Sequence, residues 1–179
     1  FNRAEVVDSN FLSFVNKERF PGSKTPIQYH DSKVNPNDLL SIFETQVLSR
    51  HMDLKARLLK DSGKCFYTIG SSGHEGNAVF GKVFSKDDIA FLHYRSTPFF
   101  IQRSLKLPGS TPIYDTALSF VASSEDPISG GRHKVIGSKM LNIPPQTSTI
   151  ASHLPKAVGT AVSIDLSLIH ISEPTRPRL

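Results

Sequence analysis

Three adjacent side chains that can hold an anion, His93, Tyr94 and Arg95, follow a short apolar run in this sequence. Arginine presents a planar fork of donors that matches phosphate oxygens, and tyrosine adds one hydroxyl. Thr97 and Pro98 come next and are typical of a helix start, where backbone N–H groups and the helix dipole also favour an anion. Alone, these residues fit two interpretations equally well: an anion site, and a surface arginine packed over a tyrosine ring.

A basic turn at residues 130–134 supplies a second group of candidate side chains. His133 can donate a proton, because an unperturbed imidazole titrates near neutrality. Arg132 and Lys134 can meet an anionic substrate or an acidic partner surface. Taken by itself, such a turn is more often a solvated loop, so its function depends on what else lies nearby.

The remaining polar motifs are weaker. Hydroxyl side chains at residues 147–149 open a later segment, and capping of helical N–H groups is their usual role. The run GSSGHEG at residues 70–76 lacks both the Gly-Lys-Ser/Thr ending of a P-loop and the GxGxxG pattern. No stretch has the spacing of metal ligands, of a nucleophile elbow or of paired carboxylates. The sequence therefore indicates no metal-binding residue.

One long helix is the clearest element that can position these groups. Asn35 can cap it, Pro36 suits its first position, and Gly63 can end it in a left-handed conformation. Apolar residues between these ends recur at three- and four-residue steps, which predicts a single buried face. The residues of that face are Leu39, Leu40, Ile42, Phe43, Val47, Leu48, Met52, Leu58 and Leu59.

Shorter elements come after this helix. A short apolar stretch begins at Cys65, and a second helix follows the Gly-rich turn, with Glu75 in its first turn where the helix dipole favours a carboxylate. Residues 89–92 are expected to form a short buried strand, and a third helix is expected to start at Pro98. Helices that alternate with short apolar strands predict an α/β layer architecture.

The last third of the chain combines two helices and a long loop. The first helix is expected at about residues 114–123, and residues 124–146 are rich in Ser, Gly and Pro, which predicts a loop. A helix of small residues is expected within residues 147–164. Pro155 either kinks this helix or marks its true start.

Composition excludes several classes of protein. With 38% hydrophobic and 21% charged residues, the chain resembles an ordinary soluble globular domain, and its net charge of +5 suits an anionic partner. Lys and Arg are scattered, so no tract resembles a nucleic-acid-binding tail. No apolar run is long enough to span a bilayer, and the N-terminus carries no recognisable signal peptide. A single cysteine, Cys65, cannot form an internal disulfide, which fits a reducing cytoplasm.

The chain divides into three parts at the sequence level. Residues 1–34 are expected to be a loosely structured N-terminal extension, and residues 35–165 the main domain. In residues 166–179, the run LSLIHISEPTR resembles a translated sequencing adapter, so we expect this tail to be non-native and exclude it from the fold. The natural protein is then expected to continue past Asp165.

Three segments in order resemble a known family. They are YTIGSSGHEGNAVFGKVFSKDDIAFLHYRSTPFF at residues 67–100, GGRHKVIGS at 130–138, and PPQTSTIASHLPKAVGTAVSI at 144–164. Together they resemble the alpha-type part of thiamine-diphosphate-dependent 2-oxoacid dehydrogenases, the decarboxylating first component of the pyruvate and branched-chain complexes. The branched-chain or a broad 2-oxoacid subgroup, fused alpha–beta forms included, is the most similar.

This resemblance implies a thiamine-diphosphate-binding fold with a parallel sheet between helix layers, incomplete in this chain. It implies that Tyr94 and Arg95 are ligands of the cofactor's diphosphate and that His93 is their polar neighbour. Ile150 matches the hydrophobic residue at the cofactor's rings, with Ser148 beside it. The activity implied is oxidative decarboxylation of a branched-chain or pyruvate-like 2-oxoacid, with transfer of the acyl group to a lipoyl group.

The sequence also departs from the family pattern. Many members carry Met-Pro-x-His after the Gly-Arg of the loop, where this chain has residues 134–137, KVIG. His133 is then the candidate catalytic histidine of the loop. The Gly-Asp-Gly…Asn segment that binds Mg²⁺ in the family is expected beyond Asp165. The activating Glu belongs to a beta-type subunit or a fused beta half, so we expect this chain alone to be inactive.

Two other functions remain open at this level. A transketolase-type enzyme would share the cofactor but not the lipoyl-bearing acyltransferase partner. A non-enzymatic binding module would use Arg132 and Lys134 on an acidic partner. Neither nucleic acid nor a membrane is expected as a partner.

Overall fold

The computed structural model describes residues 3–18, 22, 33–65 and 69–166. The chain separates into two compact units, Phe1–Asn35 and Pro36–Leu179, which are described one at a time. The tail expected to be non-native lies outside the described residues, apart from Leu166. Within the described part, no helix combines the length and the apolar character needed to cross a membrane.

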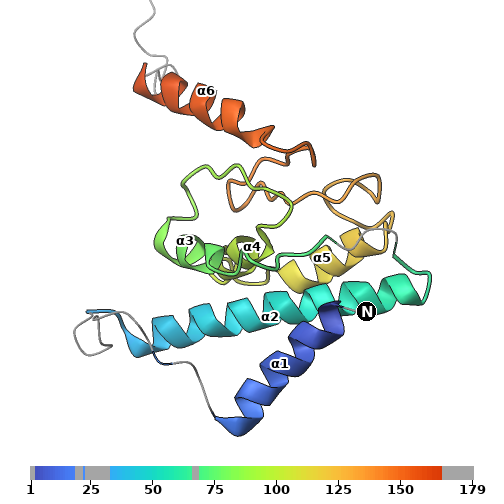
Figure 1. The fold of residues 1–179 in the computed structure, drawn as a ribbon. Helices are drawn as coiled ribbons and strands as arrows, with labels where there is room; N and C mark the ends of the chain where they lie inside the picture. The colour runs from blue at the N-terminus through green and yellow to red at the C-terminus, as the bar shows by residue number, and fades with distance from the viewer. Residues whose placement is uncertain (1–2, 19–21, 23–32, 66–68, 167–179) are drawn as a thin grey trace, which may run out of the picture. The chain divides into compact units, whose positions relative to one another are not determined.

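The first unit contains helix α1, Arg3–Lys17 (Figure 1). The expectation of a loosely structured extension was therefore wrong for this segment. Val7, Phe11 and Phe14 recur at helical steps, and Glu5 and Lys17 suit the two ends of the helix dipole. Sequence analysis missed this periodicity because Asp, Ser and Asn, which are weak helix formers, lie between the apolar residues.

Helix α2, Pro36–Asp61, opens the second unit and confirms the long predicted helix. Gly63 follows with a φ of 71°, and its N–H donates to the carbonyl of Lys60 at 2.9 Å. The N–H of Lys64 donates to the carbonyl of Leu59 at 2.8 Å. These bonds satisfy helix-end carbonyls, and the left-handed turn that they require favours glycine.

The buried face of α2 differs from the predicted one. Its buried side chains are Thr45, Ser49, Met52, Asp53 and Ala56. Several residues of the predicted apolar face are exposed instead, namely Leu39, Leu40, Phe43 and Leu58. Met52 is buried as predicted, and Leu48 and Leu59 pack against its cluster. The prediction failed at the other positions because the polar residues of the buried face have partners elsewhere in the chain, which periodicity cannot show.

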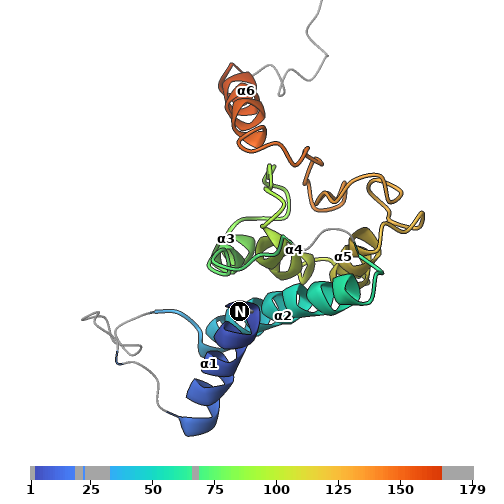
Figure 2. The ribbon, with the colours of Figure 1, turned by 45° about the vertical axis from the view of Figure 1, so that its right-hand side comes forward.

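Helix α4, Thr97–Ser104, is the centre of the second unit, and all eight of its residues are buried. It contacts α2, α3 (Asn77–Val83) and α5 (Pro112–Phe120). α3 and α4 lie side by side in both views (Figure 1, Figure 2). A Cβ on Gly81 of α3 would lie 2.6 Å from the backbone oxygen of Phe99, so this contact requires glycine.

Two hydrophobic clusters meet at α4. One joins Ile101 to residues of α2 and α5, and its buried members are Met52, Ala56, Cys65, Ile101 and Phe120. The other joins the start of α4 to the loop that follows α5, and its members are Leu92, Phe99, Phe100, Leu141 and Ile143. Burial of these side chains stabilises the arrangement because each removes apolar surface from water.

The parallel sheet is not seen in the described residues. Residues 89–92, expected as a strand, have no strand ladder, although the N–H of Ala90 donates to the carbonyl of Asn142 at 3.0 Å. The only bridge pair in the described part joins Ser138 and Ile143 in antiparallel fashion. A strand exists only with a neighbouring strand to receive its hydrogen bonds, and short apolar runs do not reveal that neighbour.

The remaining elements match the predictions in outline. α5 begins at Pro112, two residues before the expected Tyr114, and the long loop after it contains no helix. Helix α6, His153–Asp165, begins two residues before Pro155. Pro155 therefore lies in the first turn and marks the helix start, which is one of the two alternatives left open.

We predict that replacing the buried Asp53 by Ala destabilises the second unit by about 2 kcal/mol, because its partner Ser71 loses two hydrogen bonds in a buried setting. Urea unfolding followed by circular dichroism measures this. Asp61→Ala, at an exposed residue near the end of α2, is the matched control and should have little effect. Equal stabilities of the two variants would contradict this account of Asp53.

Candidate functional site

The candidate site is built on a turn held by the buried carboxylate of Asp53. Oδ1 of Asp53 accepts the N–H of Ser71 at 3.0 Å, and Oδ2 accepts the hydroxyl of Ser71 at 3.1 Å. The Ser71 hydroxyl also lies 2.5 Å from that of Ser49. A Cβ on Gly70 would lie 2.3 Å from the Asp53 carboxylate, so only glycine fits there. Helix α2 thus fixes the turn that precedes α3.

Two cationic side chains bind the carbonyls of the same turn. Nη1 of Arg95 donates to the carbonyl of Gly70 at 2.8 Å, and Nζ of Lys134 donates to the carbonyl of Ile69 at 2.7 Å. Asp53 therefore binds hydrogen-bond donors of the turn, while Arg95 and Lys134 bind its carbonyl acceptors. Three residues far apart in sequence converge here.

The predicted His93-Tyr94-Arg95 group forms a turn directly before α4. The N–H of Ser96 donates to the carbonyl of His93 at 2.9 Å, which closes the turn. The rings of His93 and Tyr94 lie 3.7 Å apart by their centroids, and the Arg95 guanidinium lies 5.7 Å from the Tyr94 ring centroid. The three side chains are half-buried, so the structure brings them together at the surface.

The predicted helix start after this turn is confirmed with two differences. α4 begins at Thr97, and Pro98 lies in its first turn. Ser96, and not Thr97, is the residue before the helix, and its side chain makes no capping hydrogen bond. Glu75, expected in the first turn of α3, precedes that helix instead, and its Oε2 accepts the N–H of Gly73 at 2.8 Å.

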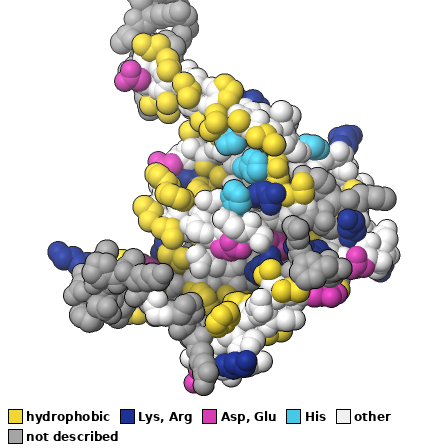
Figure 3. All heavy atoms as spheres, viewed as in Figure 1, with side chains coloured by type: hydrophobic (Ala, Val, Ile, Leu, Met, Phe, Trp, Pro, Cys, Tyr) yellow, Lys and Arg dark blue, Asp and Glu magenta, His cyan; other side chains and the backbone are white. Residues whose placement is uncertain are grey.

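Sequence reasoning missed two further histidines of the site. The His93 ring centroid lies 6.2 Å from that of His74 and 5.7 Å from that of His153. Burial lowers the pKa of His93, and the charges of His153, His74 and Arg95 lower it further. Figure 3 shows histidine side chains gathered on one face with a Lys or Arg side chain beside them. No local motif joins His74, His93 and His153, since each belongs to a different segment.

His133 and Ser148, predicted separately, are in direct contact. Nε2 of His133 accepts the N–H of Ser148 at 3.1 Å and also contacts the Ser148 hydroxyl. An Nε2 that accepts from a backbone N–H is unprotonated, so the ring proton of a neutral His133 is on Nδ1. The Ser129 hydroxyl binds the backbone of His133 at both N–H and carbonyl. This arrangement suits a group that accepts a proton.

Ile150 lies two residues beyond Ser148, and its side chain is 78% exposed. The described residues therefore give it no packing partner that would hold it in one orientation. Arg132, in the loop beside His133, is also exposed. No group of three or more His, Cys, Asp or Glu in the described part of the chain could hold a metal ion.

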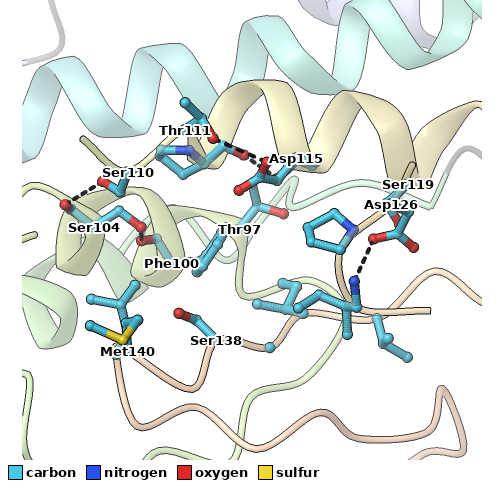
Figure 4. Close-up of a pocket in the computed structure, with 18 of the residues that line it drawn as sticks. Thr97, Phe100, Ser104, Ser110, Thr111, Asp115, Ser119, Asp126, Ser138 and Met140 are labelled. Carbon is cyan, nitrogen blue, oxygen red and sulfur yellow. Dashed lines mark hydrogen bonds between the residues drawn. The ribbon is translucent and has the colours of Figure 1, made fainter. Parts of the chain in front are cut away.

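A separate cavity of about 340 Å³ lies between α4, α5 and the following loop (Figure 4). The hydroxyl of Thr111 donates to Asp115 at 3.1 Å, and that of Ser110 donates to the carbonyl of Ser104 at 2.8 Å. These polar groups of the wall are therefore bonded to one another. His93, Tyr94 and Arg95 do not line this cavity, but Lys134, whose Nζ binds the Ile69 carbonyl, does.

Lys134 differs from a surface lysine in its surroundings. Its Nζ lies 4.7 Å from the Phe120 ring centroid, in a cation–π contact. Burial lowers the pKa of Lys134 to about 8, although the charges of Asp53 and Cys65 act in the opposite direction. The basic loop is therefore not a simple solvated turn, since one of its cations points inward.

Comparison with known proteins finds a dehydrogenase subunit among the similar chains. The chain is 28% identical over 129 residues to the 2-oxoisovalerate dehydrogenase subunit alpha of Bacillus subtilis (strain 168). The match covers 70% of this chain, which spans only 38% of the length of that protein. No protein-family profile matches the chain, and no solved structure matches it. The similarity loosely supports an alpha-type component of the 2-oxoacid dehydrogenase kind.

We predict a pH dependence of stability from Lys134. Between pH about 8 and 10.5, the unfolded lysine keeps a proton that the folded one has lost, so its contribution to stability rises with pH across that window. Unfolding free energies from urea titrations at several pH values, compared between the wild type and Lys134→Met, isolate this contribution. In Lys134→Met, the free energy of unfolding should rise less with pH across this window than it does in the wild type. Parallel pH profiles of the two proteins would show that the pKa of Lys134 is not lowered.

Proposed function

We propose that this chain is the alpha-type part of a thiamine-diphosphate-dependent 2-oxoacid dehydrogenase, and that its Tyr94–Arg95 turn binds the cofactor's diphosphate. The observation that supports this most directly is the anchoring of Arg95 on the Gly70 carbonyl, at the turn that Asp53 holds. The similarity to a 2-oxoisovalerate dehydrogenase subunit alpha agrees with the proposal.

The residues of the turn fit a diphosphate by their chemistry. A guanidinium and a phenol hydroxyl donate to phosphate oxygens, and imidazoles beside them add further donors. Because Nη1 of Arg95 already binds Gly70, its guanidinium is oriented before any ligand arrives. A donor that is held in place loses less entropy on binding, which favours affinity.

Thiamine diphosphate, when bound, supplies the carbon nucleophile and the electron sink for decarboxylation of a 2-oxoacid. Tyr94 and Arg95 position it through the diphosphate, with His93 beside them. Ile150 and Ser148 are proposed to meet its ring system. His133, whose Nε2 faces Ser148, is proposed to hold or pass a proton at that end of the site. Mg²⁺, which the family uses, finds no group of ligands in the described residues, so we assign no step to it.

The complete protein is proposed to act on a branched-chain or pyruvate-like 2-oxoacid. Residues 35–165 then form part of the cofactor-binding domain, and residues 1–34 precede it. A beta-type subunit or a fused beta half completes the site, and a lipoyl-bearing acyltransferase receives the acyl group. The cytoplasm is the proposed location.

One observation counts against the alternative of an acidic-partner module. That module needs Arg132 and Lys134 to face outward together, but Nζ of Lys134 donates to the carbonyl of Ile69. A transketolase-type enzyme remains the second candidate because it would use the same diphosphate contacts. Assay of the complete natural protein for 2-oxoacid-dependent CO₂ release and lipoyl acylation separates the two. Absence of both activities, with cofactor bound, would contradict the dehydrogenase proposal.

We predict that Arg95→Ala weakens thiamine diphosphate affinity roughly 10- to 100-fold, because hydrogen bonds to a charged group contribute about 1.5–3 kcal/mol. Isothermal titration calorimetry measures the affinity, and circular dichroism checks the fold. Arg95→Lys keeps the positive charge but not the planar fork of donors, so its affinity should lie between those of the wild type and Arg95→Ala. Lys55→Ala, which removes one exposed cation from α2, is the control for net charge. Equal weakening by Lys55→Ala and Arg95→Ala would overturn the assignment of Arg95.

A further inference from the structure

Three imidazoles converge beside Arg95 from three separate segments. His74 comes from the turn before α3, His93 from the turn before α4, and His153 is the first residue of α6. The rings of His74 and His93 are stacked, with an interplanar angle of 20°, whereas those of His93 and His153 are tilted by 58°. Within this cluster, only His93 was selected by sequence analysis, and folding adds His74 and His153.

The charges that act on His93 are all positive. Arg95, His74 and His153 are the charged groups that act on His93, and each one lowers its pKa, as burial does. The nearby carboxylate of Glu75 is engaged by the N–H of Gly73. Protonation of His93 is therefore opposed in the ligand-free protein, and an added anion would reduce that opposition.

We propose that His74, His93 and His153 form a proton-coupled site for a diphosphate group, which takes up protons when the anion binds. Its ligand is a diphosphate group, either that of a cofactor or free inorganic diphosphate; the identity as thiamine diphosphate rests on the function proposed above. The cluster is not a metal site, because no group of three or more metal-ligating side chains in the described chain has suitable geometry.

The sign of the coupling follows from linkage. A bound anion stabilises the imidazolium form relative to the neutral imidazole, so protons are taken up from solvent on binding. Affinity for the anion then increases as pH falls. One fully coupled proton changes the affinity about tenfold per pH unit.

The test uses calorimetric titration of the full chain at several pH values between 6 and 8, in two buffers of different ionisation enthalpy. The ligands are thiamine diphosphate, inorganic diphosphate and thiamine, at one fixed Mg²⁺ concentration. The double variant His74→Gln/His153→Gln keeps polar side chains at both positions but removes two titrating groups. His51→Gln, at an exposed position on α2, is the matched control.

We expect both diphosphate ligands to bind with proton uptake, and the double variant to lose a large part of that uptake and of the pH dependence. The difference in proton uptake between the wild type and the double variant excludes protons that the ligand itself takes up. Proton uptake that is equal in the wild type and the double variant overturns the inference, even if thiamine diphosphate binds.

The outcomes separate this inference from the proposed function. If inorganic diphosphate binds with histidine-dependent proton uptake but thiamine diphosphate does not bind, the cluster is supported and the dehydrogenase proposal fails. If neither diphosphate ligand binds to the chain, the inference about the histidine cluster is overturned, whereas the dehydrogenase proposal is decided by the assay of the complete natural protein. If the double variant does not fold, proton NMR of the wild type takes its place. The inference then requires the imidazole resonances to titrate at higher pH with inorganic diphosphate than without it.

Discussion

A single buried carboxylate, that of Asp53, fixes the turn on which the candidate site depends. It takes both the N–H and the hydroxyl of Ser71, in a space too narrow for any residue but glycine at position 70. A buried carboxylate without such donors would cost several kcal/mol, so the turn and the helix must form together. The carbonyls that the turn then presents orient Arg95 and Lys134.

Helix α4 connects this turn to the rest of the second unit. It follows the His93-Tyr94-Arg95 turn directly and is buried along its whole length, between clusters that reach α2, α5 and the loop after α5. Displacement of α4 would therefore move the side chains proposed to hold a diphosphate. The loop after α5 contributes His133, while Ser148 approaches it from the segment before α6. The hydrophobic clusters and the candidate site thus both depend on α4.

Local signals were predictable from the sequence, and long-range partners were not. Pro36, Gly63 and Pro98 mark helix ends through their own backbone geometry, so α2 and α4 were predicted well. The buried face of α2 was predicted only in part, because Ser49 and Asp53 are buried by a partner 18 or more residues away. The expected strand lacks a neighbour in the described residues, and His74 and His153 join the site only through folding.

The central claim is that Arg95 contacts a diphosphate. The most direct measurement is the NMR resonance of its side-chain Nε–H group, assigned by its loss in Arg95→Lys and followed during titration with thiamine diphosphate. We predict that this resonance shifts and saturates with thiamine diphosphate and with inorganic diphosphate, and that thiamine leaves it nearly unchanged. A resonance that stays in place at saturating thiamine diphosphate would contradict the account.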